Sequence, residues 1–347
     1  MKTKIARLFS ALKWKIYEFS VSLHQKLDKK FPKRSEKKKS MSGPRRMRVL
    51  FLLVMFLYPV TQFIIFWVIP NIDAVILAFT KYDRVNKQTI FTFYQFGRVF
   101  DFLKDSNSYL SRSLLNSLAY FITQNVIGLP ITLMLSYFLY KKVLGHKVFR
   151  VVFFLPSIIS GVVLATLFSN FLNPFFGPFN RMLSLISGKP MTEIPNFLGD
   201  PQYKLYTICA YTLWTGFGVN LVMISGAIAR LPAEVIEYGK IEGVGMTREL
   251  VSLIVPMIMP TLTTIIELGV AAYFTFLQPV MLLDPIGASG LSGASSVGYY
   301  IYYLFKGQMN SNFELASAVG VFCAAIGVPI IVLVRKGLAK CVEAVEY

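Results

Sequence analysis

Long uninterrupted runs of apolar residues dominate the chain, and six of them are long enough to cross a membrane. A helix rises about 1.5 Å per residue, so about 20 apolar residues span the roughly 30 Å of bilayer hydrocarbon. The six runs are Val49–Pro70, Ser113–Tyr140, Phe149–Leu172, Leu205–Ala229, Leu250–Leu277 and Leu315–Val334. This pattern predicts an all-α, polytopic membrane protein with six transmembrane helices.

The composition agrees with a membrane protein and argues against several other classes. Hydrophobic residues make up 54% of the chain and charged residues 16%, whereas an average soluble domain has about 25% charged residues. Three Cys and two His are too few for a disulfide framework or a multi-metal site. The sequence therefore gives no reason to expect a metal or any other cofactor.

Positive charge is concentrated at the start of the chain. The formal net charge is +18, and residues 1–48 hold 16 Lys or Arg against three acidic residues. This segment directly precedes the first apolar run, where basic residues orient a helix in the bilayer, so the charge does not indicate a nucleic-acid partner. Apolar positions recur at steps of three and four over residues 5–27, which is typical of an amphipathic helix at a membrane surface. A topology signal followed by a linker explains the same residues, and both interpretations stay open.

Lys and Arg in the connections set the expected orientation, because cytoplasmic segments retain them. The connection 141–150 holds four cations and no acid, whereas the connection 173–204 is rich in Pro and Gly, as expected of an external loop. Six crossings then leave both termini in the cytoplasm. The domains that we expect are a basic cytoplasmic segment (1–48), a first transmembrane helix with an external segment (49–112), a core domain of five transmembrane helices (113–335) and a cytoplasmic tail (336–347).

A polar stretch between the fourth and fifth apolar runs predicts a compact cytoplasmic elbow, residues 231–249. Pro232 suits the first turn of a helix, and Gly243 and Gly245 end that helix two or three turns later. Thr247 then begins a second helix that returns to the membrane. Because a rigid elbow transmits a push to both adjoining spans better than a flexible loop does, we interpret it as a docking element.

The same stretch resembles the EAA motif of binding-protein-dependent ABC importer permeases. The residues that match the motif at its spacing are Glu237, Ile241, Gly243, Leu250, Leu253, Pro256 and Pro260. The departures, which stand where the motif has Ala-Ala, Asp and Ala, are Tyr238-Gly239, Glu242 and Val244. Arg150–Pro156 and Ala316–Gly320 are similar to segments of the maltose-type, sugar-importing branch. The resemblance thus covers the chain from about residue 49 onward.

The resemblance implies a type I ABC importer permease fold in a bacterial cytoplasmic (inner) membrane. It implies a non-catalytic subunit that forms half of a translocation pathway, pairs with a second permease in a heterodimer, and works with an ATP-binding cassette ATPase dimer. It also implies an extracytoplasmic solute-binding protein and a saccharide cargo. The sequence agrees with this division of labour, because it has no Gly-x-x-x-x-Gly-Lys-[Ser/Thr] phosphate loop. The residues expected to couple to the ATPase are Glu234, Glu237, Gly239, Glu242, Gly243 and Gly245.

Polar residues inside the predicted spans are candidates for the pathway or a subunit interface. They are Asn116, Asn125, Thr215, Asn220 and Glu267. Amides and hydroxyls can hydrogen-bond to sugar hydroxyls, although most such residues serve helix packing. A carboxylate in a span is costly and usually lines a cavity or meets another helix, so Glu267 is expected at a cavity wall or interface. A tyrosine cluster before the last span predicts a belt at the outer membrane interface, and its members are Tyr299, Tyr300, Tyr302 and Tyr303.

Two alternatives to a saccharide importer remain. A membrane-embedded transferase would need an active site in an external segment, 70–112 or 278–312, but those segments offer dispersed acids and neither His nor Cys. The same transporter class with a different cargo, such as a glycerol phosphate or an acidic saccharide, fits the sequence as well, because a binding protein on another chain does much of the selection.

Overall fold

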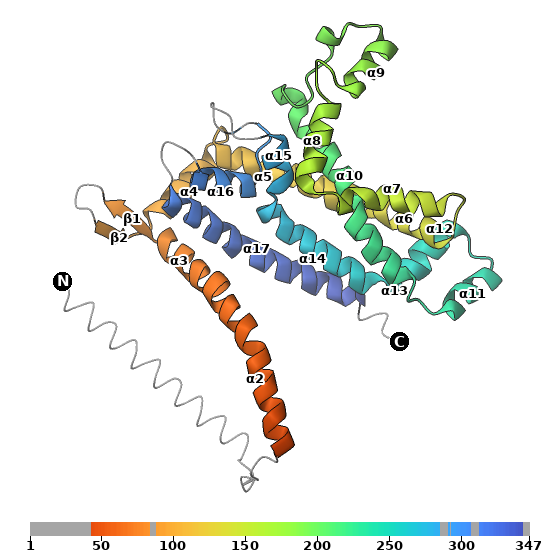
Figure 1. Cartoon of the computed structure of the whole chain (residues 1–347), viewed down its shortest axis with the longest axis horizontal. Helices are drawn as coiled ribbons and strands as arrows, with labels where there is room; N and C mark the ends of the chain where they lie inside the picture. The colour runs from red at the N-terminus through yellow and green to blue at the C-terminus, as the bar shows by residue number, and fades with distance from the viewer. Residues whose placement is uncertain (1–42, 84–87, 285–290, 292, 307–311, 343–347) are drawn as a thin grey trace. The chain divides into compact units, whose positions relative to one another are not determined.

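The chain is described by a computed structural model (Figure 1). It describes residues 43–83, 88–284, 291, 293–306 and 312–342. The predicted amphipathic helix at residues 5–27 and most of the basic segment lie outside the described residues. By their contacts the residues fall into two units, 1–69 and 70–347, and each unit is described by itself.

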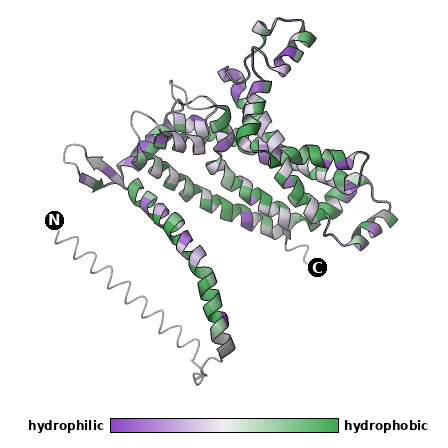
Figure 2. Cartoon of the chain, in the orientation of Figure 1, coloured by the Kyte–Doolittle hydropathy of each residue, from purple (hydrophilic) through white to green (hydrophobic). Residues whose placement is uncertain are grey.

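The described part of the first unit, from residue 43 onward, is a single helical run that is mostly apolar. Helix α2 spans Gly43–Phe63, and a π-helical segment, η1, follows over Ile64–Val68. No side chain of this unit from residue 47 onward is buried, and apolar residues cover most of α2 (Figure 2). A helix that is apolar on all sides is suited to contact with lipid or with other helices, as predicted for the first span.

The second unit opens with α3 (Ile69–Ala78), a short hairpin and α4 (Tyr94–Lys104). The antiparallel hairpin pairs β1 (Thr80–Asp83) with β2 (Gln88–Phe91), with Thr80 opposite Phe91. This hairpin is the one sheet among the described residues, so the chain is essentially all-α, as predicted.

Four helical runs are individually long and apolar enough to cross a membrane. They are Met47–Ala78, Tyr109–Tyr140, Pro201–Ile228 and Phe313–Leu338. The second comprises α5 (Tyr109–Phe121), the π-helical η2 (Ile122–Gly128) and α6 (Leu129–Tyr140). The others in this unit are α10 (Pro201–Ile228) and α17 (Phe313–Val342). Helix α10 packs against α6 and α7, and α17 packs against α14.

The third and fifth predicted spans are each broken by a sharp bend. Helices α7 (His146–Ile158) and α8 (Gly161–Phe171) meet at 107°. The segments α12 (Met246–Arg248), η4 (Glu249–Ile254) and α13 (Val255–Met257) meet α14 (Met259–Thr275) at 76°. Ile159 is extended, and the second bend lies between two prolines, each of which lacks a donor N–H. The described helices thus give four spans, or up to six if each bent pair crosses once.

Short helices fill the connections. These are α9 (Pro178–Ser187), the 3₁₀ turn η3 (Met191–Glu193), α11 (Ala233–Ile241), α15 (Gln278–Leu283) and α16 (Val297–Lys306). Helix α9 lies within the connection 173–204, which was predicted to be an external loop. Pro178 occupies its first turn and Gly188, at φ 68°, ends it, so the residues that suggested a loop mark the boundaries of a helix.

Two apolar clusters hold the second unit together. One joins α4, α5, α15, α16 and α17, and the other joins α6, α10, α14 and the elbow. Two of the four tyrosines of the predicted interfacial belt lie in the protein interior. Tyr299 and Tyr300 are only 1% and 5% exposed and belong to the first cluster, because α16 packs against both α17 and α5.

Candidate functional site

The elbow folds as a short helix, a tight turn and a second helix. Helix α11 ends at Ile241, where the backbone N–H of Val244 donates to the carbonyl of Gly239 at 3.0 Å. Gly243 has φ 70°. This is the geometry of a Schellman cap, in which the residue after the helix adopts a left-handed conformation that glycine tolerates best. Gly243 therefore ends the helix, as its place in the sequence predicts.

One face of the elbow is anchored in the apolar core. Ile236 is 4% exposed and packs in the cluster that contains Ile228 and Ile254. Gly239 is also buried, and a Cβ at this position would lie 2.8 Å from Cδ1 of Leu253 on η4. Helix α11 therefore lies directly on the return helix, and even a methyl group at Gly239 requires the end of the Leu253 side chain to move.

The opposite face of the elbow is open and carries acidic and apolar side chains together. Glu234, Glu237 and Glu242 are exposed, and Tyr238 and Ile241 are 64% and 84% exposed. The hydrogen bond and negative charge of Glu242 raise the pKa of Tyr238 above its ordinary value, so Tyr238 presents a neutral phenol. Large apolar side chains in an exposed patch rimmed by charges are typical of a protein-binding surface.

Gly245 has a different role in the turn. It has φ −68°, precedes α12 and accepts a hydrogen bond of 2.8 Å from the backbone N–H of Glu249. No atom lies within 4 Å of a Cβ added at Gly245. All six predicted coupling residues thus lie between Glu234 and Gly245, on α11 and in the turn that follows it. Gly239 faces the core and the others face outward.

A buried ion pair, which the sequence did not single out, lies beneath the elbow. Lys141 Nζ lies 2.7 Å from Glu249 Oε2, and the two side chains are 19% and 5% exposed. Lys141 is one of the four cations of the connection 141–150, and Glu249 is the last residue of the predicted elbow. Their pairing follows from the fold, because 108 positions separate them along the chain.

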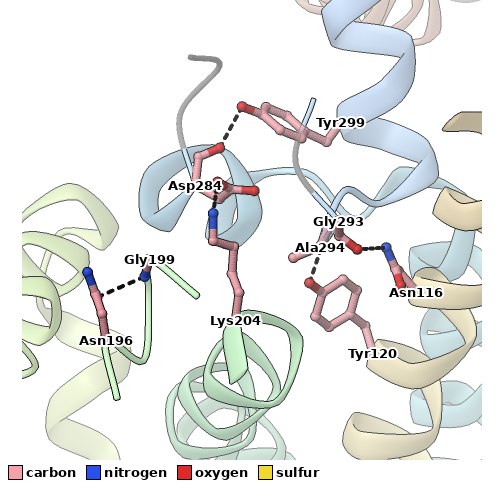
Figure 3. A network of polar contacts seen from close by, with 9 residues as sticks. All are labelled: Asn116, Tyr120, Asn196, Gly199, Lys204, Asp284, Gly293, Ala294 and Tyr299. Carbon is pink, nitrogen blue, oxygen red and sulfur yellow. Dashed lines mark hydrogen bonds and ion pairs between the residues drawn. The ribbon is translucent and has the colours of Figure 1, made fainter. Parts of the chain in front are cut away.

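The side-chain amide of Asn116 donates hydrogen bonds to a segment distant in the sequence (Figure 3). Its Nδ2 donates to the carbonyls of Gly293 at 2.7 Å and Ser295 at 3.0 Å. On the next turn of α5, the Tyr120 hydroxyl donates to the carbonyl of Ala294 at 2.7 Å. Helix α5 thus holds the turn 293–295, and the Asn116 amide is hydrogen-bonded within the chain.

The other polar candidates in the spans lie along separate helix contacts. Asn125 Nδ2 donates to the carbonyl of Phe121 at 3.1 Å, and its amide occupies the space that a Cβ on Gly269 would need. Thr215 Oγ1 donates to the carbonyl of Thr212 at 3.3 Å, and Asn220 is half-buried on α10. Within the part of the chain that the structure describes, these side chains are not hydrogen-bonded to one another.

Glu267 has a partner in the same chain. Its Oε1 lies 3.8 Å from Nε of Arg335 on α17, where the Arg335 side chain is 74% exposed and that of Glu267 24% exposed. The sequence suggested a carboxylate at a cavity wall or a subunit interface. The structure brings it next to a cation, which lowers the cost of placing a charge on an apolar helix.

A second polar network joins α10, α15 and α16. Lys204 Nζ lies 3.0 Å from Asp284 Oδ1, and the Tyr299 hydroxyl donates to the Asp284 carbonyl at 2.7 Å (Figure 3). Burial raises the pKa of Asp284 above its ordinary value, while the hydrogen bond and charge of Lys204 oppose this. Among the described residues, no three His, Cys, Asp or Glu side chains lie close enough together to hold a metal ion.

Comparison with known proteins gives a consistent picture. No family model matches the chain. A probable ABC transporter permease protein, YurN of Bacillus subtilis, is 24% identical over 274 residues, which are 78% of this chain and 92% of YurN. The maltose/maltodextrin permease MalF of Escherichia coli is 24% identical over 182 residues, 50% of this chain but only 35% of MalF.

The fold agrees with these relatives. A crystal structure of a bacterial ABC transporter involved in the import of the acidic polysaccharide alginate matches with a TM-score of 0.71 and 23% identity, over 85% of this chain and 96% of that one. Together with the apolar helices, this supports a multi-pass protein of the inner membrane. In such importers a partner ATPase hydrolyses ATP, so the permease is non-catalytic. The chain therefore has homologues among the ABC transporter permeases and the fold of an ABC importer permease.

Proposed function

We propose that this chain forms half of the translocation pathway of an ATP-driven saccharide importer. A second permease supplies the other half, and an ATPase dimer docks on residues 231–249. An extracytoplasmic solute-binding protein delivers the cargo. The observation that carries the proposal is that the elbow has one buried and one exposed face. Ile236 and Gly239 are buried against the core, whereas Glu234 and Glu237 are exposed.

The elbow is suited to transmit force because it is rigid at both ends. Helix α11 is seated on η4, and the Schellman turn at Gly243 fixes the angle between the two helices. A partner that pushes on the exposed face therefore displaces the return helix as well. A flexible loop between the same spans would absorb that displacement. We infer that Glu234, Glu237, Glu242, Gly243 and Gly245 form the ATPase-facing surface and that Gly239 maintains its seating.

The proposed orientation places the elbow and both termini in the cytoplasm. The connection 141–150 supports it with four cations and no acid, because cytoplasmic loops are enriched in Lys and Arg. The structure places Lys141 of this connection next to Glu249 at the foot of the elbow. This contact supports a position of the elbow on the same side of the membrane as the basic connection.

Saccharide cargo is proposed from the relatives. MalF is named for maltose and maltodextrin, and the structural match belongs to an importer of an acidic polysaccharide. A related crystal structure contains the alginate transporter with a pentasaccharide-bound periplasmic protein. Neutral and acidic saccharides are thus both candidates. A membrane-embedded transferase has no support from these relatives.

Reconstitution tests the proposal. The chain is expected to co-purify with a second permease and an ATPase, and a cargo-loaded binding protein should stimulate ATP hydrolysis in proteoliposomes. A thermal-shift screen of the cognate binding protein against neutral maltodextrins and acidic oligosaccharides would identify the cargo. Purification of the chain without an ATPase partner, or hydrolysis that does not respond to the binding protein, would refute the proposed function.

A further inference from the structure

The buried ion pair under the elbow links two parts of the fold that are otherwise distant in sequence. Lys141 is the residue that ends α6, and Glu249 begins the π-helical segment of the return helix. Their charged atoms are 2.7 Å apart, and the Glu249 side chain is only 5% exposed. A charge-assisted contact this short and buried is much less screened by solvent than a surface pair.

Each charge also suits the helix that carries it. Lys141 lies at the C-terminus of α6, where the helix dipole favours a cation, and Glu249 lies in the first turns of the return helix, where it favours an anion. The Lys141 ammonium is also 5.5 Å from the centroid of the Tyr137 ring. Burial disfavours the Lys141 ammonium, but the hydrogen bond and charge of Glu249, with those of Tyr137, leave its pKa above its ordinary value.

The two ends of the helix that carries Lys141 make different contacts. The run Tyr109–Tyr140 is one long helix. Its N-terminal part, α5, is hydrogen-bonded to the segment 293–295 through Asn116 and Tyr120. Its C-terminal end meets the elbow through the contact of Lys141 with Glu249. Glu249 is the first residue of the π-helical segment η4, and π-helical turns are frequent at functional sites. A continuous helical run with contacts at both ends can carry a displacement from one end to the other.

We propose that the Lys141–Glu249 pair is the positioning contact through which movement of the elbow reaches the helix 109–140. This inference rests on the proposed function, because it assumes that an ATPase moves the elbow. It assigns to Lys141 and Glu249 a role in transmission, in addition to the docking surface on α11. Lys141 and Glu249 touch neither cargo nor ATP in this role and act through the helices that they join.

A reducible crosslink between the two positions tests the proposal in the assembled importer. The variant Lys141→Cys/Glu249→Cys, in a background without the native cysteines, is expected to assemble with its partners. Binding-protein stimulation of ATP hydrolysis and uptake should fall by about 2- to 30-fold, the range in which single contacts modulate coupling between sites. A bis-methanethiosulfonate crosslinker that joins the two cysteines should restore stimulation, and reductant should remove it again. Lys147→Met, which removes an exposed cation of the same connection, is the matched control and should behave as wild type.

Two results would overturn the proposal. Full stimulation in the unlinked cysteine pair would show that the contact is dispensable for transmission. Failure of that variant to assemble, or assembly with stimulation that the crosslinker does not restore, would show that the pair serves folding alone. Failure of the proposed function is distinguishable from both, because it would appear in the wild-type complex as hydrolysis that does not respond to the loaded binding protein.

Discussion

Glu267 illustrates how a partner distant in sequence changes the interpretation of a single residue. Seen alone, a carboxylate in an apolar helix indicates a cavity or an interface. The structure places Arg335 at 3.8 Å, with most of the arginine side chain exposed. We therefore expect Glu267→Gln to assemble normally and to cost at most about 1 kcal/mol, since exposed ion pairs contribute little.

Glu267→Leu separates the remaining roles, with co-purification of the second permease and uptake as the two measurements. Loss of uptake with normal assembly would identify a pathway residue, and loss of the second permease would identify an interface residue. Full assembly with full uptake would leave Glu267 with only its ion pair to Arg335.

Asn116 and Asn125 form a matched pair for testing structural amides. Asn116 donates to two carbonyls of another segment, whereas Asn125 donates to Phe121, four residues back in its own helical run. Asn116→Ala leaves two acceptors without this donor and should destabilise the permease by about 1–3 kcal/mol. Asn125→Ala should destabilise the permease clearly less than Asn116→Ala does. Thermal unfolding of the purified variants in detergent measures both effects. Equal losses of stability would contradict the conclusion that Asn116 holds the segment 293–295.

At the scale of elements, the seating of α11 on η4 predicts a size limit at Gly239. A Cβ there meets only the flexible end of Leu253, so Gly239→Ala should be tolerated after a small side-chain shift. Gly239→Val adds two methyl groups in the same space and should displace α11, at a cost of about 1–3 kcal/mol, as is typical of overpacking. Retention of the ATPase on the purified complex is the readout, and wild-type retention in Gly239→Val would contradict this seating.

The bends in the third and fifth spans show where prediction from sequence ends. Both halves of each bent pair are apolar, so the hydrophobic pattern identifies the segments but not the bends of 107° and 76°. Pro256 and Pro260 mark the place of the second bend but do not fix its angle. Gly243 was predictable, because a left-handed cap has a local signature. The Lys141–Glu249 and Lys204–Asp284 pairs were not, because each depends on how helices far apart in the chain pack together.

At the scale of the whole molecule, the proposed topology predicts alternating accessibility along the chain. Single cysteines at residues 30, 145, 240 and 345 should react only from the cytoplasmic side, and those at residues 90, 190 and 295 only from the outside. The positive residues of 141–150 give the physical reason, since they resist transfer across the membrane. Labelling of intact cells with an impermeant thiol reagent measures this, and external reaction at residue 240 would remove the elbow from the side of the ATPase.

The central claim is that the elbow couples this permease to an ATPase, and two glycines test it most directly. Neither Gly243 nor Gly245 has an atom within 4 Å of an added Cβ, but Gly243 has φ 70° and Gly245 has φ −68°. Valine at position 243 therefore strains the turn by about 1–3 kcal/mol, while valine at position 245 fits the backbone.

The decisive measurement is binding-protein-stimulated ATP hydrolysis by the reconstituted importer with Gly243→Val or Gly245→Val, at equal abundance of the assembled complex. We predict that Gly243→Val loses most of the stimulation and the uptake, whereas Gly245→Val, which adds a side chain to the proposed surface without straining the backbone, loses clearly less of both. Wild-type stimulation in Gly243→Val would contradict the account.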